Sequence, residues 1–117
     1  MSHQVQIDYQ AIAIQCNSIC EVAEKQLKEL DEMIATLEET STQLLTDETK
    51  RLKKQIEKER DDLLEKIKKV RENAYEKALK GICSVDSDSV EYRKRNEAIN
   101  AARDLQNTVN VLASTKL

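Results

Sequence analysis

Residues 40–47 read Thr-Ser-Thr-Gln-Leu-Leu-Thr-Asp, and this polar stretch decides how the chain folds. Its first three residues are poor helix formers because their hydroxyl groups compete for backbone hydrogen bonds. Thr46 or Asp47 can then cap a new helix, with the acidic Glu48 in its first turn. The sequence therefore predicts a break between two helices here, at which the chain turns back on itself.

Apolar residues recur at spacings of three, four and seven on both sides of this break, which places them on one face of each helix. Before the break the stripe comprises Val5, Tyr9, Ile12, Cys16, Ile19, Ala23, Leu30, Ile34 and Leu37. After the break it comprises Leu52, Ile56, Leu63, Ile67, Val70, Ala74 and Ala78. We therefore expect helices over residues 5–40 and 47–80, the second ended by Gly81 in the left-handed conformation.

The two stripes mirror each other about residue 43, which favours an antiparallel hairpin. Steps of four, three, four and seven lead forward from Ile12 to Leu30 and backward from Ala74 to Ile56. In this register Gln26 and Arg60 would face each other as a polar layer. Because a heptad pattern also matches itself after a slide of seven residues, a continuous rod of about 75 residues, necessarily oligomeric, is the alternative.

The charge distribution agrees with the hairpin. The chain has a net charge of −3, but residues 1–45 carry 8 acidic and 2 basic side chains, whereas residues 46–80 carry 9 acidic and 12 basic ones. Helices of opposite charge are stabilised when they lie side by side. We therefore expect the acidic arm to pack against the basic arm.

A third helix is expected over residues 88–114. Asp88, followed three residues later by Glu91, resembles a capping box. The apolar stripe of this helix is rich in alanine and comprises Ala98, Ala102, Leu105, Val109 and Leu112. With no Pro and one Gly in 117 residues, the chain lacks the turn residues of a sheet protein. The fold class predicted is an all-α, antiparallel three-helix bundle, with residues 1–117 forming one domain.

The start of the first helix carries more apolar surface than one stripe requires. A contiguous exposed apolar patch usually marks a contact surface, so we expect self-association or partner binding there. The candidate interface residues are Val5, Ile7, Tyr9, Ala11, Ile14, Ile82 and Val85. The alternative is that residues 81–88 fold over this end of the bundle and cover it. The function predicted is a non-enzymatic protein–protein interaction or scaffold module, acting as a homodimer or on a helical protein partner.

Nucleic-acid binding is the first rival function. Lys50-Arg51-Leu52-Lys53-Lys54 in the second helix and Arg93-Lys94-Arg95 in the third could contact phosphates. Acidic residues interleave with the first run, however, and neither run contains an aromatic residue to stack on bases. A solvated helix face, or one paired with the acidic arm, explains these residues better.

The sequence contains few candidate residues for catalysis or metal binding. His3 is the single histidine, and no Glu-x-x-His pair exists to build a di-metal site. Cys16 and Cys20 lie one helical turn apart and are interpreted as small buried apolar groups rather than zinc ligands. We predict no enzymatic activity, no cofactor and no metal. Three cysteines and the absence of a signal-peptide or membrane-spanning pattern favour a cytoplasmic protein with no membrane association.

A small helical secretion-associated protein is the last alternative. The chain shares its length and helical build with the helical-hairpin proteins of type VII secretion. It lacks their Trp-x-Gly turn, and residues Ala13, Leu79 and Asn96 stand where their Tyr-x-x-x-acidic signal requires an acidic residue. No residue role is therefore carried over from that family.

Overall fold

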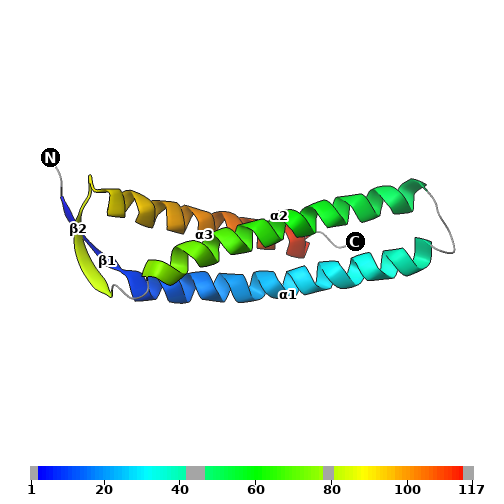
Figure 1. Ribbon diagram of the computed structural model, residues 1–117, viewed down its shortest axis with the longest axis horizontal. Coiled ribbons are helices and arrows are strands. Elements are labelled where there is room, and N and C mark those ends of the chain that lie inside the picture. The colour runs from blue at the N-terminus through cyan, green and yellow to red at the C-terminus, as the bar shows by residue number, and fades with distance from the viewer. Residues whose placement is uncertain (1–2, 42–46, 78–80, 115–117) are drawn as a thin grey trace.

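The computed structural model describes residues 3–41, 47–77 and 81–114, which form three helices and a small sheet (Figure 1). The elements are β1 (Gln4–Asp8), α1 (Tyr9–Ser41), α2 (Asp47–Lys77), β2 (Ile82–Asp86) and α3 (Val90–Ser114). Each helix packs against the other two, in an elongated particle of 64 × 24 × 21 Å. The all-α three-helix bundle predicted from the sequence is confirmed.

The first two helices form the predicted hairpin (Figure 1). Helix α1 ends at Ser41 and α2 begins at Asp47, so the break falls where the polar stretch predicts it. Residues 42–46, including the proposed cap Thr46, lie outside the described residues.

One continuous core runs between the three helices. Its buried members are Cys16, Cys20, Ala23, Leu30, Ile34, Ile56, Leu63, Ile67, Val70, Ala102, Leu105 and Val109. Most of the residues in the predicted stripes are therefore core residues. Burying these apolar side chains is the main favourable contribution to folding.

The predicted polar layer between Gln26 and Arg60 differs from the structure. The Nε2 atom of Gln26 donates a hydrogen bond to the backbone carbonyl of Val109 in α3, at 2.9 Å. Arg60 instead binds the carboxylates of Asp31 and Asp61 at the surface. The prediction was wrong because it aligned only the two helices of the hairpin, whereas the hydrogen-bond partner of Gln26 lies in α3.

The first helix starts later than predicted, because residues 4–8 form a strand. Strand β1 pairs antiparallel with β2, so that Val5 lies opposite Val85. The side chain of Asp8 then caps α1, since its Oδ1 accepts a hydrogen bond from the amide of Ala11 at 3.1 Å. Tyr9, which opens the helix, donates its amide hydrogen to the carbonyl of Gly81 at 3.1 Å.

The connections at both ends of β2 use local turn chemistry. Gly81 has φ of 65°, the left-handed conformation predicted for it, although residues 78–80 before it lie outside the described residues. Ser89, rather than Asp88, caps α3, because its Oγ accepts a hydrogen bond from the amide of Tyr92 at 3.2 Å. The Oδ1 of Asp86 accepts the amide hydrogen of Asp88, so Asp88 belongs to the turn before the cap.

Candidate interaction surfaces

The end of the bundle that carries the predicted interface is partly covered by the sheet. Ile7, Tyr9 and Val85 are buried together in a small second core, against which Tyr92 of α3 also packs. Strand β2 therefore covers much of the apolar start of the chain, as the alternative interpretation proposed. These three residues of the predicted interface are not accessible to a partner in this conformation.

The rest of the predicted interface is exposed to differing degrees. Ile14 and Ile82 are 70% and 69% exposed, Ala11 is also exposed, and Val5 is partly buried. Single exposed apolar residues are common on protein surfaces and need no partner. The predicted interface is thus reduced to a few side chains around the sheet.

A second surface, which the sequence analysis missed, lies near the turn of the hairpin. The helices α1 and α2 continue past the last described turn of α3 (Figure 1). At 1.5 Å per residue, α3 with 25 residues extends about 37 Å, whereas α1 with 33 residues extends about 50 Å. The final part of the hairpin is therefore without a third helix among the described residues.

An open groove of about 450 Å³ occupies this part of the hairpin. We call it the end groove, and it is lined by Glu29, Glu32, Met33, Thr36 and Leu37 of α1 and by Leu52 and Ile56 of α2. Ile56 is buried at its floor, while Met33, Leu37 and Leu52 are half-buried and pack against the main core. The groove thus presents apolar side chains between its two helices.

The end groove continues the one that α3 occupies. Gln26, which binds α3, lies one heptad before Met33 on the same face of α1. On α2, Lys66 contacts α3 through Asp104 and lies two heptads after Leu52. Because residues seven apart share a helix face, α3 and the end groove occupy the same side of the hairpin.

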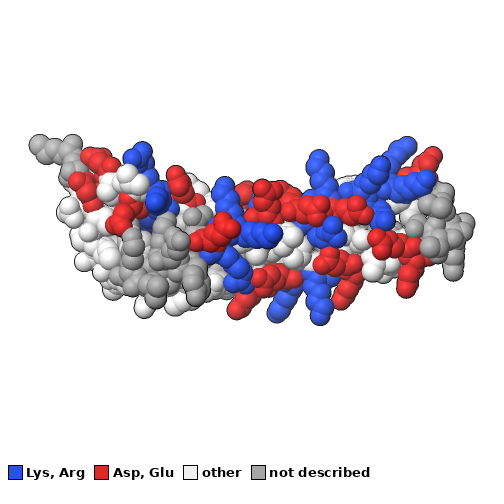
Figure 2. All heavy atoms as spheres, viewed as in Figure 1, with Lys and Arg blue, Asp and Glu red and all other residues white. Residues whose placement is uncertain are grey.

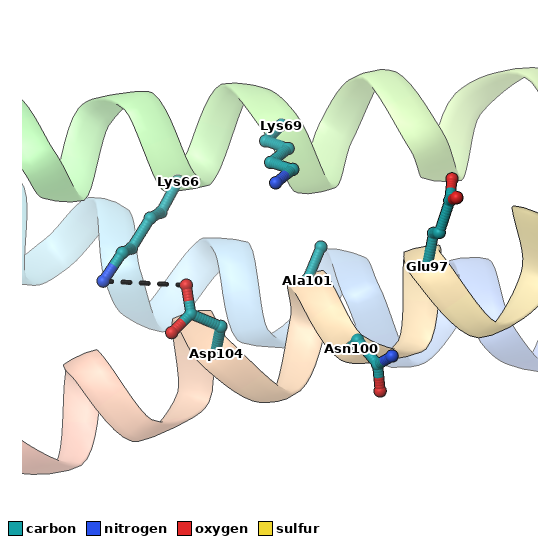
Figure 3. A pocket seen from close by; sticks show the side chains of 6 residues that line it. All are labelled: Lys66, Lys69, Glu97, Asn100, Ala101 and Asp104. Carbon is teal, nitrogen blue, oxygen red and sulfur yellow. Dashed lines mark ion pairs between the residues drawn. The ribbon is translucent and has the colours of Figure 1, made fainter.

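Where α3 is present, charged side chains seal its seam with α2. Figure 3 shows Lys66 directed at Asp104, with 3.6 Å between the Nζ and Oδ2 atoms. Lys66 also donates a hydrogen bond to the hydroxyl of Thr108 at 2.8 Å. The cleft of about 320 Å³ beside this pair is lined by Lys66, Lys69, Glu97, Asn100, Ala101 and Asp104. This cleft combines opposite charges from the two helices, so its lining is more polar than that of the end groove.

Among the described residues, three ion pairs join the acidic arm to the basic arm, as the charge distribution predicts. They are Glu24 with Arg71, Asp31 with Arg60, and Glu38 with Lys53. The Arg71 guanidinium donates hydrogen bonds to the Glu24 carboxylate, which raise the pKa of Arg71. Each pair is solvent-exposed and is worth at most about 1 kcal/mol, so the pairs set orientation more than stability.

The basic residues of α2 do not form a uniform basic face. Lys53, in the middle of the first basic run, lies 3.3 Å from Glu38 and 3.7 Å from Glu57. Figure 2 shows acidic and basic side chains mixed along the visible face of the molecule. This mixture lowers the positive potential that phosphate binding requires.

The cysteine thiols are poor candidates for chemistry. Cys16 and Cys20 are buried, and their burial raises the pKa of both thiols, so little thiolate forms at neutral pH. Cys83 in β2 is half-buried. In the described ranges, no three or more His, Cys, Asp or Glu side chains are grouped so that they could hold a metal ion.

Comparison with known proteins gives no relative. No protein-family model, curated protein or solved structure matches the chain. Among the described helices, none combines the length and the apolar character needed to cross a membrane. The surfaces of the molecule are therefore the basis for a functional proposal.

Proposed function

We propose that the chain is a non-enzymatic interaction module that binds a helix of another protein in the end groove. The observation that carries this proposal is the apolar side chains of Met33, Leu37 and Leu52, left half-exposed where α3 no longer covers the hairpin. A groove between two helices is a common docking site for an amphipathic helix. The same hairpin already holds α3 in this way farther along.

Self-association through the sheet end is the second candidate. The strong exposure of Ile14 and Ile82 supports it, as does the open edge of each strand in a two-stranded sheet. The area available is small, since Ile7, Tyr9 and Val85 are already buried within the chain. In the end groove, apolar side chains from two helices line one depression, and we favour it for this reason.

Nucleic-acid binding is less well supported than protein binding. The lysine at the centre of the first basic run, Lys53, is paired with two carboxylates. If the module nevertheless bound nucleic acid, it would be retained on heparin and released by modest salt, because such binding depends on counterion release. A module that binds only a protein helix through apolar side chains would not be retained on heparin.

The test selects helical peptides on the full chain and measures their affinity for two matched double variants. Met33→Gln with Leu52→Gln makes the end groove polar at nearly constant side-chain volume. Ile14→Gln with Ile82→Gln removes apolar surface from the sheet end instead. We expect the groove variant to weaken binding by about tenfold or more, because the loss of buried anchor residues has effects of this size. The sheet-end variant should have little effect. Failure to select any peptide, or loss of binding only in the sheet-end variant, would contradict the proposal.

A further inference from the structure

The charges around the end groove indicate what kind of helix fits it. Glu29 and Glu32 of α1 lie along one side of the groove. Glu59 of α2 is not one of the lining residues, but it lies seven residues after Leu52 and three after Ile56, and so on the same face of that helix. Within residues 3–41, 47–77 and 81–114, the ion pairs of α1 and α2 do not include these three carboxylates. The α1 side of the end groove is therefore acidic, and Glu59 adds a further carboxylate on the face of α2 that borders it.

Where α3 is bound to the hairpin, the charges of α3 are opposite to those of the α2 flank that it contacts. There the α2 flank carries Lys66 and Lys69, and α3 presents Glu97 and Asp104 to it (Figure 3). Lys66 pairs with Asp104, so the bound helix supplies the charge opposite to that of the hairpin. One heptad farther toward the turn, the residue equivalent to Lys66 is Glu59. The sign of the flank thus reverses near the end of α3.

We infer that the end groove receives an amphipathic helix with lysine or arginine on its flanks, supplied by another protein. Its apolar stripe would pack on Met33, Leu37 and Leu52, and its basic side chains would contact Glu29 and Glu32. This inference rests on the proposed function and adds the chemistry of the partner. Complementary charges across such a contact increase the association rate and exclude partners of the wrong sign.

A second copy of the chain fits this groove poorly. Because α3 covers the rest of the hairpin face, two copies could join their end grooves only with their long axes antiparallel and their α3 helices pointing away from each other. A two-fold axis perpendicular to the long axis gives this arrangement. It keeps the α1 side of one groove over the α1 side of the other, so that α1 lies against α1. Glu32, near the middle of the α1 side of the groove, would then approach Glu32 of the second copy, and like charges in contact oppose association.

The experiment compares two labelled helical peptides with the same leucine and alanine stripe. One carries lysine on its flanks and the other carries glutamate, and fluorescence anisotropy measures their binding to the full chain at 50 and 300 mM salt. We expect the lysine peptide to bind more tightly by about tenfold at low salt, with a smaller difference at high salt, because screening weakens exposed charge contacts. Solution mass measured in parallel should be that of one chain.

Matched charge reversals locate the contact. Glu29→Lys with Glu32→Lys should reverse the preference, so that the glutamate peptide binds better. Glu21→Lys with Glu65→Lys changes the net charge equally on exposed positions outside the groove and should alter the ratio less than about threefold. Binding of both peptides without preference, or preference for the glutamate peptide by the unaltered chain, would overturn the inferred partner chemistry and leave the proposed function standing. Binding of neither peptide would overturn both, and a dimer that Met33→Gln abolishes would show a second copy as the occupant.

Discussion

Replacing Gln26 with leucine is expected to stabilise the bundle, although it removes the hydrogen bond between α1 and α3. The Nε2 atom of Gln26 donates to the carbonyl of Val109, but its buried Oε1 has no hydrogen-bond partner among the described residues. Losing the bond costs about 1 kcal/mol, whereas removing an unsatisfied buried acceptor returns about 1–3 kcal/mol. The carbonyl of Val109 lies within α3 and remains an acceptor in the helix.

The net change expected for Gln26→Leu is therefore a gain of about 1 kcal/mol in the free energy of unfolding, or about 4 °C in melting temperature for a chain of this size. Gln26→Glu keeps the shape but turns a carboxylate toward the Val109 carbonyl, and should destabilise the protein by about 2 kcal/mol. Urea denaturation followed by circular dichroism measures both. A loss of more than 1 kcal/mol in Gln26→Leu would refute the reasoning, because Oε1 would then have a partner that the structure does not show.

Three further predictions concern the core, the turn and the thiols. Leu63→Ala should lower the free energy of unfolding by about 3 kcal/mol because Leu63 is fully buried. Leu64→Ala changes a partly exposed neighbour and should lower it by less than about 1 kcal/mol. Equal losses in urea denaturation would contradict the placement of Leu63 in the core. Gly81→Ala should cost about 1 kcal/mol through its φ of 65° alone, since nothing lies within 4 Å of an added Cβ; an unchanged denaturation midpoint would argue against that conformation. Burial raises the pKa of Cys16 and Cys20, so their contribution to stability is present below the ordinary thiol pKa and is lost as pH rises through the raised values. The urea concentration at the denaturation midpoint should decrease as the pH is raised from about 8 to 10. The decrease should be smaller in the double variant Cys16→Ala with Cys20→Ala; an equal decrease in the unaltered protein and the variant would exclude the thiols as its cause.

The hairpin was predictable because its signals are local and repeated. The polar stretch before Asp47 ends one helix, and the spacing from Ile12 to Leu30 repeats in reverse from Ile56 to Ala74. Core residues on a helix must recur every three or four positions, so their pattern can be recognised without the structure. The opposite charge of the two arms gave independent support, which the three ion pairs between them confirm.

The sheet was missed because its pairing is distant in sequence. Residues 4–8 read Gln-Val-Gln-Ile-Asp, an alternation of polar and apolar side chains that is typical of a strand. The apolar spacing from Val5 to Tyr9 also fits a helix, and the partner strand Ile82–Asp86 is more than 70 residues away. Asp8 was the available signal, since an aspartate before a helical stripe is a typical cap and places the helix start at Tyr9.

The end groove could not be predicted from the apolar stripes. Met33, Leu37 and Leu52 have the spacing of core residues, and the sequence does not distinguish a covered core position from an uncovered one. The distinction depends on how far α3 extends along the hairpin, which is set by where the sheet places the start of α3. Glu29 and Glu32 likewise resembled ordinary surface residues until the groove beside them was known.

The most direct test of the account is a methyl NMR titration of the isotope-labelled chain with the lysine-flanked peptide. We expect shifts concentrated at the methyl groups of Met33, Leu37 and Leu52 in the end groove, with those of Ile14 and Ile82 at the sheet end unchanged. Shifts centred on Ile14 and Ile82, or spread evenly over the molecule, would contradict a docking site at the end of the hairpin.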